Sequence, residues 1–305
     1  MFLNRKKTTF GRHESFSLRY GWLTKGFNAL KNGETFGDDA TVTLGVGRNM
    51  VNAIKYWLKA CQITDEQGKE FTPIGEAIFD VDTGFDPFLE DEATIWLLHW
   101  LLTTNPTHAT AIYWFFNKFH KREFTSEEVQ TALADFSKEY LDGKTSLSTI
   151  KGDAQLVLKM YSVKNVIKQK DPIEDLLDSP LSLLKLVNCG VNDKAFYSKP
   201  ERRSQLPLNI LAYAVTEYML QCNKVEIPLE DLMYAKDDHV APGAIFRLTE
   251  SDLMTKLERI VNLKPNILRI NETAGMSQLY LNTKDLDPMD YLRDHYKEYT
   301  KGAAA

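Results

Sequence analysis

The chain has 305 residues, of which 43% are hydrophobic and 11% aromatic. This is enough apolar material for one large domain or two to three small ones, and it excludes a disordered or fibrous protein. The net charge of −5 argues against a protein that coats nucleic acid indiscriminately.

The lack of a recognisable targeting signal and the spacing of the cysteines both favour a cytoplasmic protein. No apolar run is long enough for a signal peptide or a membrane-spanning helix, so we expect no membrane partner. The three cysteines (Cys61, Cys189 and Cys222) are far apart and form no CxxC pair, as expected in a reducing compartment. They also have no nearby histidine that would indicate a zinc site or a nucleophile.

Charge is segregated along the chain. Residues 1–31 carry seven Lys or Arg and one acid, residues 61–100 carry one Lys and ten acids, and residues 144–170 carry six Lys and one acid. Two basic segments therefore flank an acidic one. Solvated faces explain such runs, and a basic N-terminus is also typical of proteins that contact DNA phosphates.

The segment from Phe16 to Gly26 mixes aromatic residues with two cations, Arg19 and Lys25. Aromatic stacking and phosphate contacts suit nucleic acid. Alternatively, the aromatic side chains only pack against a neighbouring helix. We therefore predict a DNA contact for the two cations rather than for the aromatic rings.

An amphipathic helix is predicted over about 48–62, because apolar residues recur there at helical spacing after a Gly-Val-Gly turn at 45–47. In one interpretation this is a recognition helix that enters the major groove of DNA. In another, the glycine turn and the helix N-terminus bind the phosphate of a nucleotide. The third glycine of GxGxxG and the Walker lysine are missing, which weakens nucleotide binding. An ordinary helix with exposed cations is the remaining alternative. The candidate DNA-binding donors are Arg48, Asn49, Asn52, Lys55 and Lys59.

The next segment adds a hairpin and a second helix, so the order of predicted elements, helix-hairpin-helix, is that of a winged helix. A short hairpin is predicted from Thr64 to Phe71 with Gly68 at its turn, followed by a helix that Thr72-Pro73 opens and that runs through Phe79. Lys69 on this hairpin is a further DNA-binding candidate. We predict an N-terminal winged-helix-like DNA-binding module over residues 1–85.

A helical core is predicted over residues 86–170. It contains apolar helices over 91–104 and 109–119 and a helix from the capping box of Thr125 and Glu128 to about 141. His99 lies between Trp96 and Trp100, which favours a packed or interface residue over a catalytic base.

The remaining residues, 171–305, are predicted to form C-terminal winged-helix-like modules. A short helix at Ser179-Pro180, a strand over 195–198, a turn over 200–203 and a helix over 207–221 form a weaker helix-hairpin-helix pattern. After Pro228 follow a helix, a turn at Pro242-Gly243, a helix to Asn262, and strands over 267–270 and 278–281. Arg202 and Arg203 complete the DNA-binding candidates. The predicted fold class is mainly α, with winged-helix and helix-turn-helix modules and small β-hairpins around a helical core.

Catalytic candidates are few. Asp80 and Asp82, near Glu76 and Asp86, supply paired carboxylates of the kind that hold Mg²⁺, although a solvated acidic loop is the alternative. No strand carries a carboxylate pair with a lysine as in restriction-type nucleases. Magnesium is therefore expected only if the chain is a nuclease, and no other cofactor is predicted.

Several segments resemble the signature segments of a bacterial family long catalogued as a domain of unknown function. They are 18–26, 44–51 with Ile54, Tyr56 and Trp57, 96–100, 242–248 and 272–275. Genes of that family lie beside phosphoadenosine-phosphosulfate-reductase-like genes in DNA phosphorothioation and antiphage defence islands. The resemblance covers nearly the full chain and is most specific in the first two segments.

The resemblance implies a DNA-nicking component that acts with a cysteine desulfurase, an ATPase and a sulfur-activating enzyme. A nick or a locally opened strand would expose the backbone where sulfur replaces a non-bridging phosphate oxygen. No catalytic residue can be transferred, because no nicking motif matches positions of this chain.

Three hypotheses follow from the sequence. The leading one is a DNA-binding subunit of a phosphorothioation or allied defence system, with nicking as a further activity. The first alternative is a non-catalytic scaffold that docks partners through the acidic 61–100 segment and a Trp96/Trp100 face. The second is a metal-dependent nuclease that uses Asp80 and Asp82.

Overall fold

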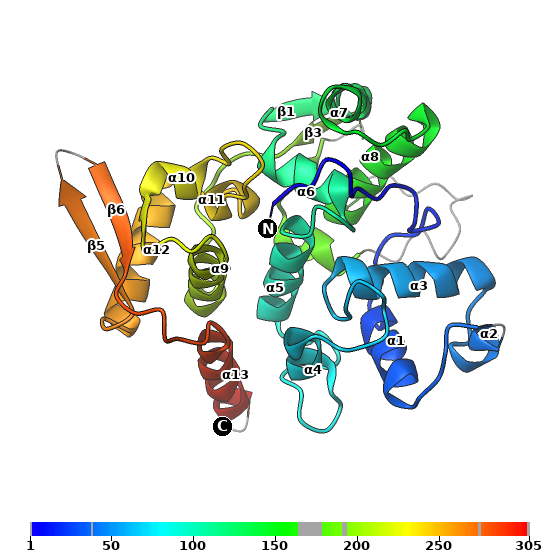
Figure 1. Ribbon diagram of the computed structural model, residues 1–305, viewed down its shortest axis with the longest axis horizontal. Coiled ribbons are helices and arrows are strands. Elements are labelled where there is room, and N and C mark those ends of the chain that lie inside the picture. Colours follow the sequence, from blue (N-terminus) through cyan, green and yellow to red (C-terminus); the bar gives the residue numbers. More distant parts are fainter. Residues whose placement is uncertain (1, 38, 164–178, 191–193, 274–275, 304–305) are drawn as a thin grey trace. The chain divides into compact units, whose positions relative to one another are not determined.

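The computed structural model describes all residues except 1, 38, 164–178, 191–193, 274–275 and 304–305. The chain divides into two compact units, Leu3–Lys199 and Pro200–Ala305 with Met1–Phe2. Each unit is mainly helical and holds one three-stranded antiparallel sheet (Figure 1). The predicted boundary at 170 lies outside the described residues, and the three-part division at 85 and 170 stays a prediction.

The unit Leu3–Lys199 is built from helices and one small sheet. Its sheet has the order β1-β3-β2, and Phe196 of β3 lies opposite both Phe124 of β1 and Cys189 of β2. The elements are α1 Trp22–Lys31, α2 Ala40–Thr43, α3 Arg48–Ala60, α4 Pro73–Phe79, α5 Glu92–Thr103, α6 Thr110–Asn117, β1 Glu123–Thr125, α7 Ser126–Tyr140, α8 Leu147–Tyr161, the 3-10 helix η2 Pro180–Leu184, β2 Asn188–Cys189 and β3 Ala195–Tyr197.

The core of this unit lies around α5 and α6, whose residues from Ala93 to Thr103 and from Thr110 to Asn117 are all buried. His99 Nδ1 lies 2.8 Å from the hydroxyl oxygen of Tyr161 and packs edge-on against aromatic rings. It is thus a packed residue, as predicted. Trp96 and Trp100 are 1% and 0% exposed. The predicted Trp96/Trp100 docking face is therefore wrong, because both indoles are buried.

Several predicted helices have their expected starts. Thr125 and Glu128 form a complete capping box at the start of α7, since each side chain accepts a hydrogen bond from the other residue's backbone N–H. Thr72 caps α4 by accepting from the N–H of Gly75. The capping oxygens satisfy donors that a helix start otherwise leaves unpaired, which is why these residues mark the boundaries.

α1 packs closely on α3. A Cβ atom at Gly26 would come within 2.7 Å of Ile54 Cγ2 and 2.9 Å of Leu58 Cδ1, so only glycine lets the two helices approach this far. The indole N–H of Trp57 donates to the carbonyl oxygen of Phe16 at 3.2 Å, which fastens the N-terminal segment to α3. α3 is thereby held on its apolar side.

The unit Pro200–Ala305 has the sheet order β4-β6-β5, with Leu279 of β6 opposite Ile227 of β4 and Ile270 of β5. The predicted turn at Pro242-Gly243 is instead the start of a one-turn helix, since proline suits the first helical position. The elements are α9 Leu208–Gln221, β4 Glu226–Pro228, α10 Leu229–Met233, α11 Pro242–Ile245, α12 Glu250–Leu263, β5 Leu268–Thr273, β6 Met276–Leu281 and α13 Met289–Ala303.

The mainly α fold class is confirmed, whereas winged-helix modules are not. The segment from Thr64 to Phe71 forms a turn with one antiparallel bridge between its two ends, not a pair of strands. The carboxylate of Asp65 accepts the backbone N–H groups of Lys69 and Glu70, which a strand ladder would otherwise use. Within the described part of the chain, no helix is both long and apolar enough to cross a membrane.

Candidate nucleic-acid interface

α3 exposes a row of hydrogen-bond donors. Its buried side is formed by residues such as Ile54, Trp57 and Leu58, which pack into the unit. The opposite side carries the predicted donors: Arg48, Asn49, Asn52 and Lys55 are exposed, and Lys59 is half-buried. The sequence prediction of one apolar and one cationic side is therefore confirmed.

The N-terminal end of α3 is electropositive. Its N-cap residue, Gly47, has no side chain that could cap the helix, and no acidic residue stands in the first turn. Arg48 instead adds a positive charge where the helix dipole is already positive. The two positive charges repel each other when nothing is bound. An anion such as a phosphate at this end of α3 would relieve that repulsion.

The far end of the row lies against the 64–71 turn. Gly68 has a φ of 73°, and a Cβ atom there would come 2.5 Å from Lys59 Cε, so the lysine chain lies over the glycine. Burial, together with the neighbouring charge of Lys55, lowers the pKa of Lys59. Lys69 is exposed on the same turn. Lys59 thus packs against this turn, and Lys69 belongs to it.

Arg19 lies just before α1, and Lys25 lies within it. The guanidinium of Arg19 lies 5.5 Å and 5.0 Å from the ring centroids of Phe16 and Trp22. Lys25 is exposed, and its Nζ donates to the carbonyl oxygen of Leu44 at 3.0 Å. Both cations are held in place, which lowers the entropy cost of contacting an anion.

The two arginines predicted in the other unit differ from each other. Arg202 is exposed, whereas the side chain of Arg203 is 6% exposed and lies 3.4 Å from a carboxylate oxygen of Glu201. Burial lowers the pKa of Arg203. A guanidinium in the interior cannot reach a DNA surface, so we leave Arg203 out of the proposed interface.

Asp80 and Asp82 share a lysine that the sequence analysis missed. Lys31 Nζ lies 2.8 Å from Asp80 Oδ2 and 3.3 Å from Asp82 Oδ2. The other oxygen of Asp80 accepts the backbone N–H groups of Asp82 and Thr83. Lys31 is 49 residues from Asp80, so no sequence motif links them.

These carboxylates do not fit a magnesium ion well. Lys31 already supplies the positive charge that they bind, and a metal would have to displace it. Asp86 accepts the backbone N–H groups of Glu90 and Asp91 and the hydroxyl of Thr94, so it organises a turn. Among the residues that the structure describes, no three His, Cys, Asp or Glu side chains gather as a metal site.

Asp80 is expected to titrate at about pH 2. The hydrogen bond from Lys31 is the main cause that lowers the pKa of Asp80 to about 2, and two backbone N–H groups add to it. Because the folded pKa lies below the ordinary value of about 3.9, this ion pair stabilises the fold above pH 4 and is lost as the pH falls towards 2. A ¹³C NMR titration should show that midpoint, and Lys31→Met should move it upward. A midpoint near 4 in both proteins would contradict the pairing.

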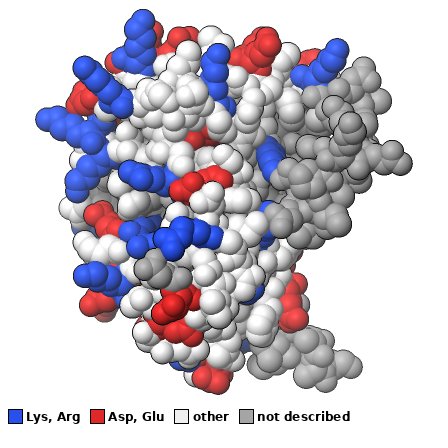
Figure 2. Space-filling model, turned by 90° about the vertical axis from the view of Figure 1, so that its right-hand side faces the viewer, with Lys and Arg blue, Asp and Glu red and all other residues white. Residues whose placement is uncertain are grey.

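Figure 2 shows the face of the molecule that forms the right-hand side of Figure 1, where α2 and α3 lie. Lys and Arg side chains project most densely on the left of this face, with acidic side chains between them. Such a mixed surface, together with the net charge of −5, does not suit indiscriminate coating of nucleic acid.

Comparison with known proteins identifies the family. The chain belongs to the family described as Protein of unknown function (DUF4007), whose model matches residues 10–296. This confirms the resemblance that the sequence segments indicated. No curated protein sequence matches the chain.

Two similar solved structures are of SspB. One is a magnesium ion-bound SspB crystal structure, with a TM-score of 0.82, and the other is an SspB crystal structure, with a TM-score of 0.81. Each is 29% identical to this chain, and each match covers 95% of this chain and 88% of the SspB chain. The similarity therefore extends over both units.

Proposed function

We propose that this protein is a DNA-binding component of a bacterial DNA phosphorothioation system. Its similarity to SspB over 95% of the chain supports the pathway. The observation that carries the DNA-binding role is the exposed row on α3, which presents Arg48, Asn52 and Lys55 on one side of a well-packed helix.

The residue types on α3 suit two kinds of DNA contact. Arginine and asparagine can form paired hydrogen bonds with the edges of guanine and adenine, and arginine and lysine both neutralise phosphate charge. The uncapped, positive start of α3 beside Gly47 adds an electrostatic attraction for the backbone. Lys69 and Arg19 extend the interface along the same unit. A helix of this length can place these donors in one groove.

The proposed partners are those of the pathway: a cysteine desulfurase, an ATPase and a sulfur-activating enzyme. Exposed acidic residues of the 61–100 segment outside the 64–71 turn, such as Glu76 and Glu90, offer these partners a docking surface. A chain that co-purifies with them and binds no DNA would be a scaffold, which is the competing function.

Nicking is a second candidate activity, because one of the similar SspB structures holds a magnesium ion. Asp80 and Asp82 are the proposed but poorly fitting ligands, since Lys31 bridges both carboxylates. A nick that survives Asp80→Asn with Asp82→Asn would place any catalytic site elsewhere.

The test is fluorescence anisotropy of the full chain with labelled duplex DNA over a salt series, with and without Mg²⁺. We expect the logarithm of the association constant to fall linearly with the logarithm of salt concentration, by about 0.9 for each phosphate contacted. A denaturing gel of the same samples would reveal nicking. Absence of binding at low salt would overturn the DNA-binding proposal and favour the scaffold.

A further inference from the structure

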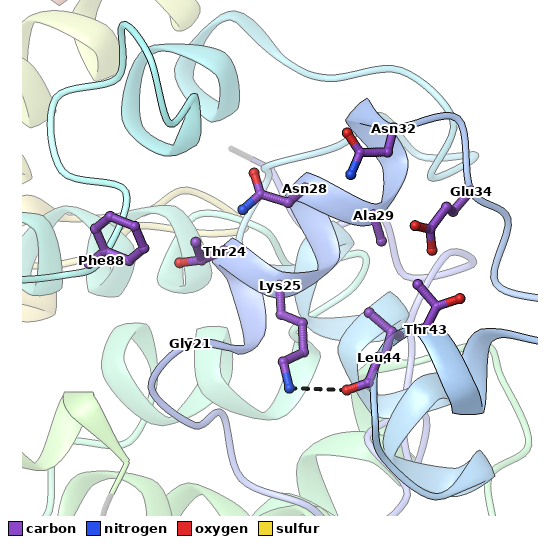
Figure 3. Close-up of a pocket in the computed structure, with 10 residues that line it drawn as sticks. All are labelled: Gly21, Thr24, Lys25, Asn28, Ala29, Asn32, Glu34, Thr43, Leu44 and Phe88. Atoms are coloured by element: carbon purple, nitrogen blue, oxygen red, sulfur yellow. Dashed lines mark hydrogen bonds between the residues drawn. The ribbon is translucent and has the colours of Figure 1, made fainter.

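An open groove of about 420 Å³ runs beside α1. This volume is within the range of about 300–1,000 Å³ that small-molecule sites occupy. Figure 3 shows that α1 contributes the side chains along its length, while Phe88 lies beyond Thr24 and Asn28, and Thr43 and Leu44 lie on the other side. The groove residues come from four parts of the chain: 21–32, 34, 43–44 and 88.

Phe88 is an aromatic ring that a rigid turn holds in solvent. The ring is 63% exposed, although its neighbours on both sides are fixed. The hydroxyl of Thr24 donates to the carbonyl oxygen of Pro87, and the buried carboxylate of Asp86 accepts three hydrogen bonds from residues 90–94. The exposure of Phe88 is therefore built into the turn, and the ring offers a flat apolar surface beside the groove.

Asn28 provides a polar atom that lacks a partner. Its Oδ1 is shielded from solvent and accepts no hydrogen bond from any described residue. Leaving a buried acceptor unsatisfied costs free energy, and a bound donor would recover it once the half-buried Asn28 side chain turns this oxygen towards the groove. Asn32, one helical turn further along α1, is exposed in the same groove. The groove thus pairs amide groups with an aromatic surface.

The charge of the groove is balanced. Lys25 and Glu34 are its charged residues, and Lys25 donates to the carbonyl oxygen of Leu44 at one side. A site for a phosphate or another anion would not contain a carboxylate. A neutral, flat ligand with donors and acceptors on its edge fits better, and a nucleobase has these properties.

We infer that this groove binds an unpaired nucleobase of DNA, which stacks on Phe88 and hydrogen-bonds to Asn28. The inference rests on the proposed DNA-binding function and adds a substrate class to it: DNA with a base out of the helix. α3 binds the paired duplex, and the groove beside α1 holds the displaced base.

The test compares the affinities of the full chain for two labelled DNA probes, a fully paired duplex and the same duplex with one bulged adenine. We expect the bulged probe to bind about tenfold tighter, because stacking of a base on an aromatic ring contributes about 1–3 kcal/mol. Phe88→Ala and Asn28→Leu should each remove this gain and leave binding of the paired duplex unchanged. Phe88→Trp should keep it.

Tyr234→Ala is the matched control, because Tyr234 is 55% exposed and lies outside the groove. Equal affinity of the two probes, or a gain that survives Phe88→Ala, would overturn the groove assignment and leave the α3 proposal standing. Binding of the bulged probe that depends on Phe88 but not on α3 would support the groove and contradict the α3 proposal. Absence of binding to both probes would overturn both.

Discussion

Replacing Arg48 and Lys55 with glutamate should weaken binding of duplex DNA about 100-fold, on the order of 3 kcal/mol. Both side chains are exposed on the solvent side of α3, so each substitution replaces a phosphate attraction by a repulsion. The slope of log association constant against log salt should also fall by about 2, since two phosphate contacts disappear. Anisotropy over a salt series measures both quantities.

The same substitutions should leave the fold intact. Exposed positions away from buried contacts usually change the free energy of unfolding by less than about 0.5 kcal/mol. A glutamate at position 48 would also complement the helix dipole, because this residue begins α3 and no acid stands in its first turn. Urea denaturation should therefore give a stability equal to or above that of the wild type.

Lys284→Glu with Lys297→Glu makes the same change in net charge on exposed positions of the other unit and serves as the control. If this control weakens binding as much as the α3 variant, the loss comes from total charge and α3 is not the interface. A loss confined to the α3 variant supports the specific contact.

The sequence predicted helices best where capping and apolar spacing agree. α4 has its predicted start at Pro73 and end at Phe79, and α7 begins at the predicted capping box. The sequence did not predict α1, because a glycine such as Gly26 disfavours a helix locally. The glycine is required at this position by a distant contact, the close packing of α1 on Ile54 and Leu58 of α3. Such a contact between helices leaves no mark in local spacing.

The candidate site was predictable only within one element. The donors of α3 are four or so residues apart in sequence, so helical periodicity alone places them on one side. The pairing of Asp80 with Lys31, and the meeting of Phe88 with Asn28, depend on how distant segments pack. Arg203 was misjudged for the same reason, because tertiary packing buries a residue that belongs to a polar stretch of sequence.

Gly75→Ala should destabilise the unit Leu3–Lys199 by about 3 kcal/mol or more. A Cβ atom there would come within 2.2 Å of the carbonyl oxygen of Ile63, which is backbone and has little room to move. That oxygen also accepts from the backbone N–H of Thr72, the N-cap residue of α4. The substitution would therefore disrupt the contact that fixes the 64–71 turn and Lys69 against α4. Urea denaturation followed by far-UV circular dichroism measures the loss.

Gly152→Ala is the matched control, because Gly152 lies within α8, is exposed, and a Cβ atom there meets no atom within 4 Å. Alanine in an open helical position removes the entropy penalty of glycine, so this variant should gain about 0.5–1 kcal/mol. Opposite signs at the two positions would show that the close approach of the turn to α4, and not helix propensity, sets the requirement for Gly75. A gain in stability for Gly75→Ala would mean that the turn does not lie against α4, and the placement of Lys69 in the interface would fall with it.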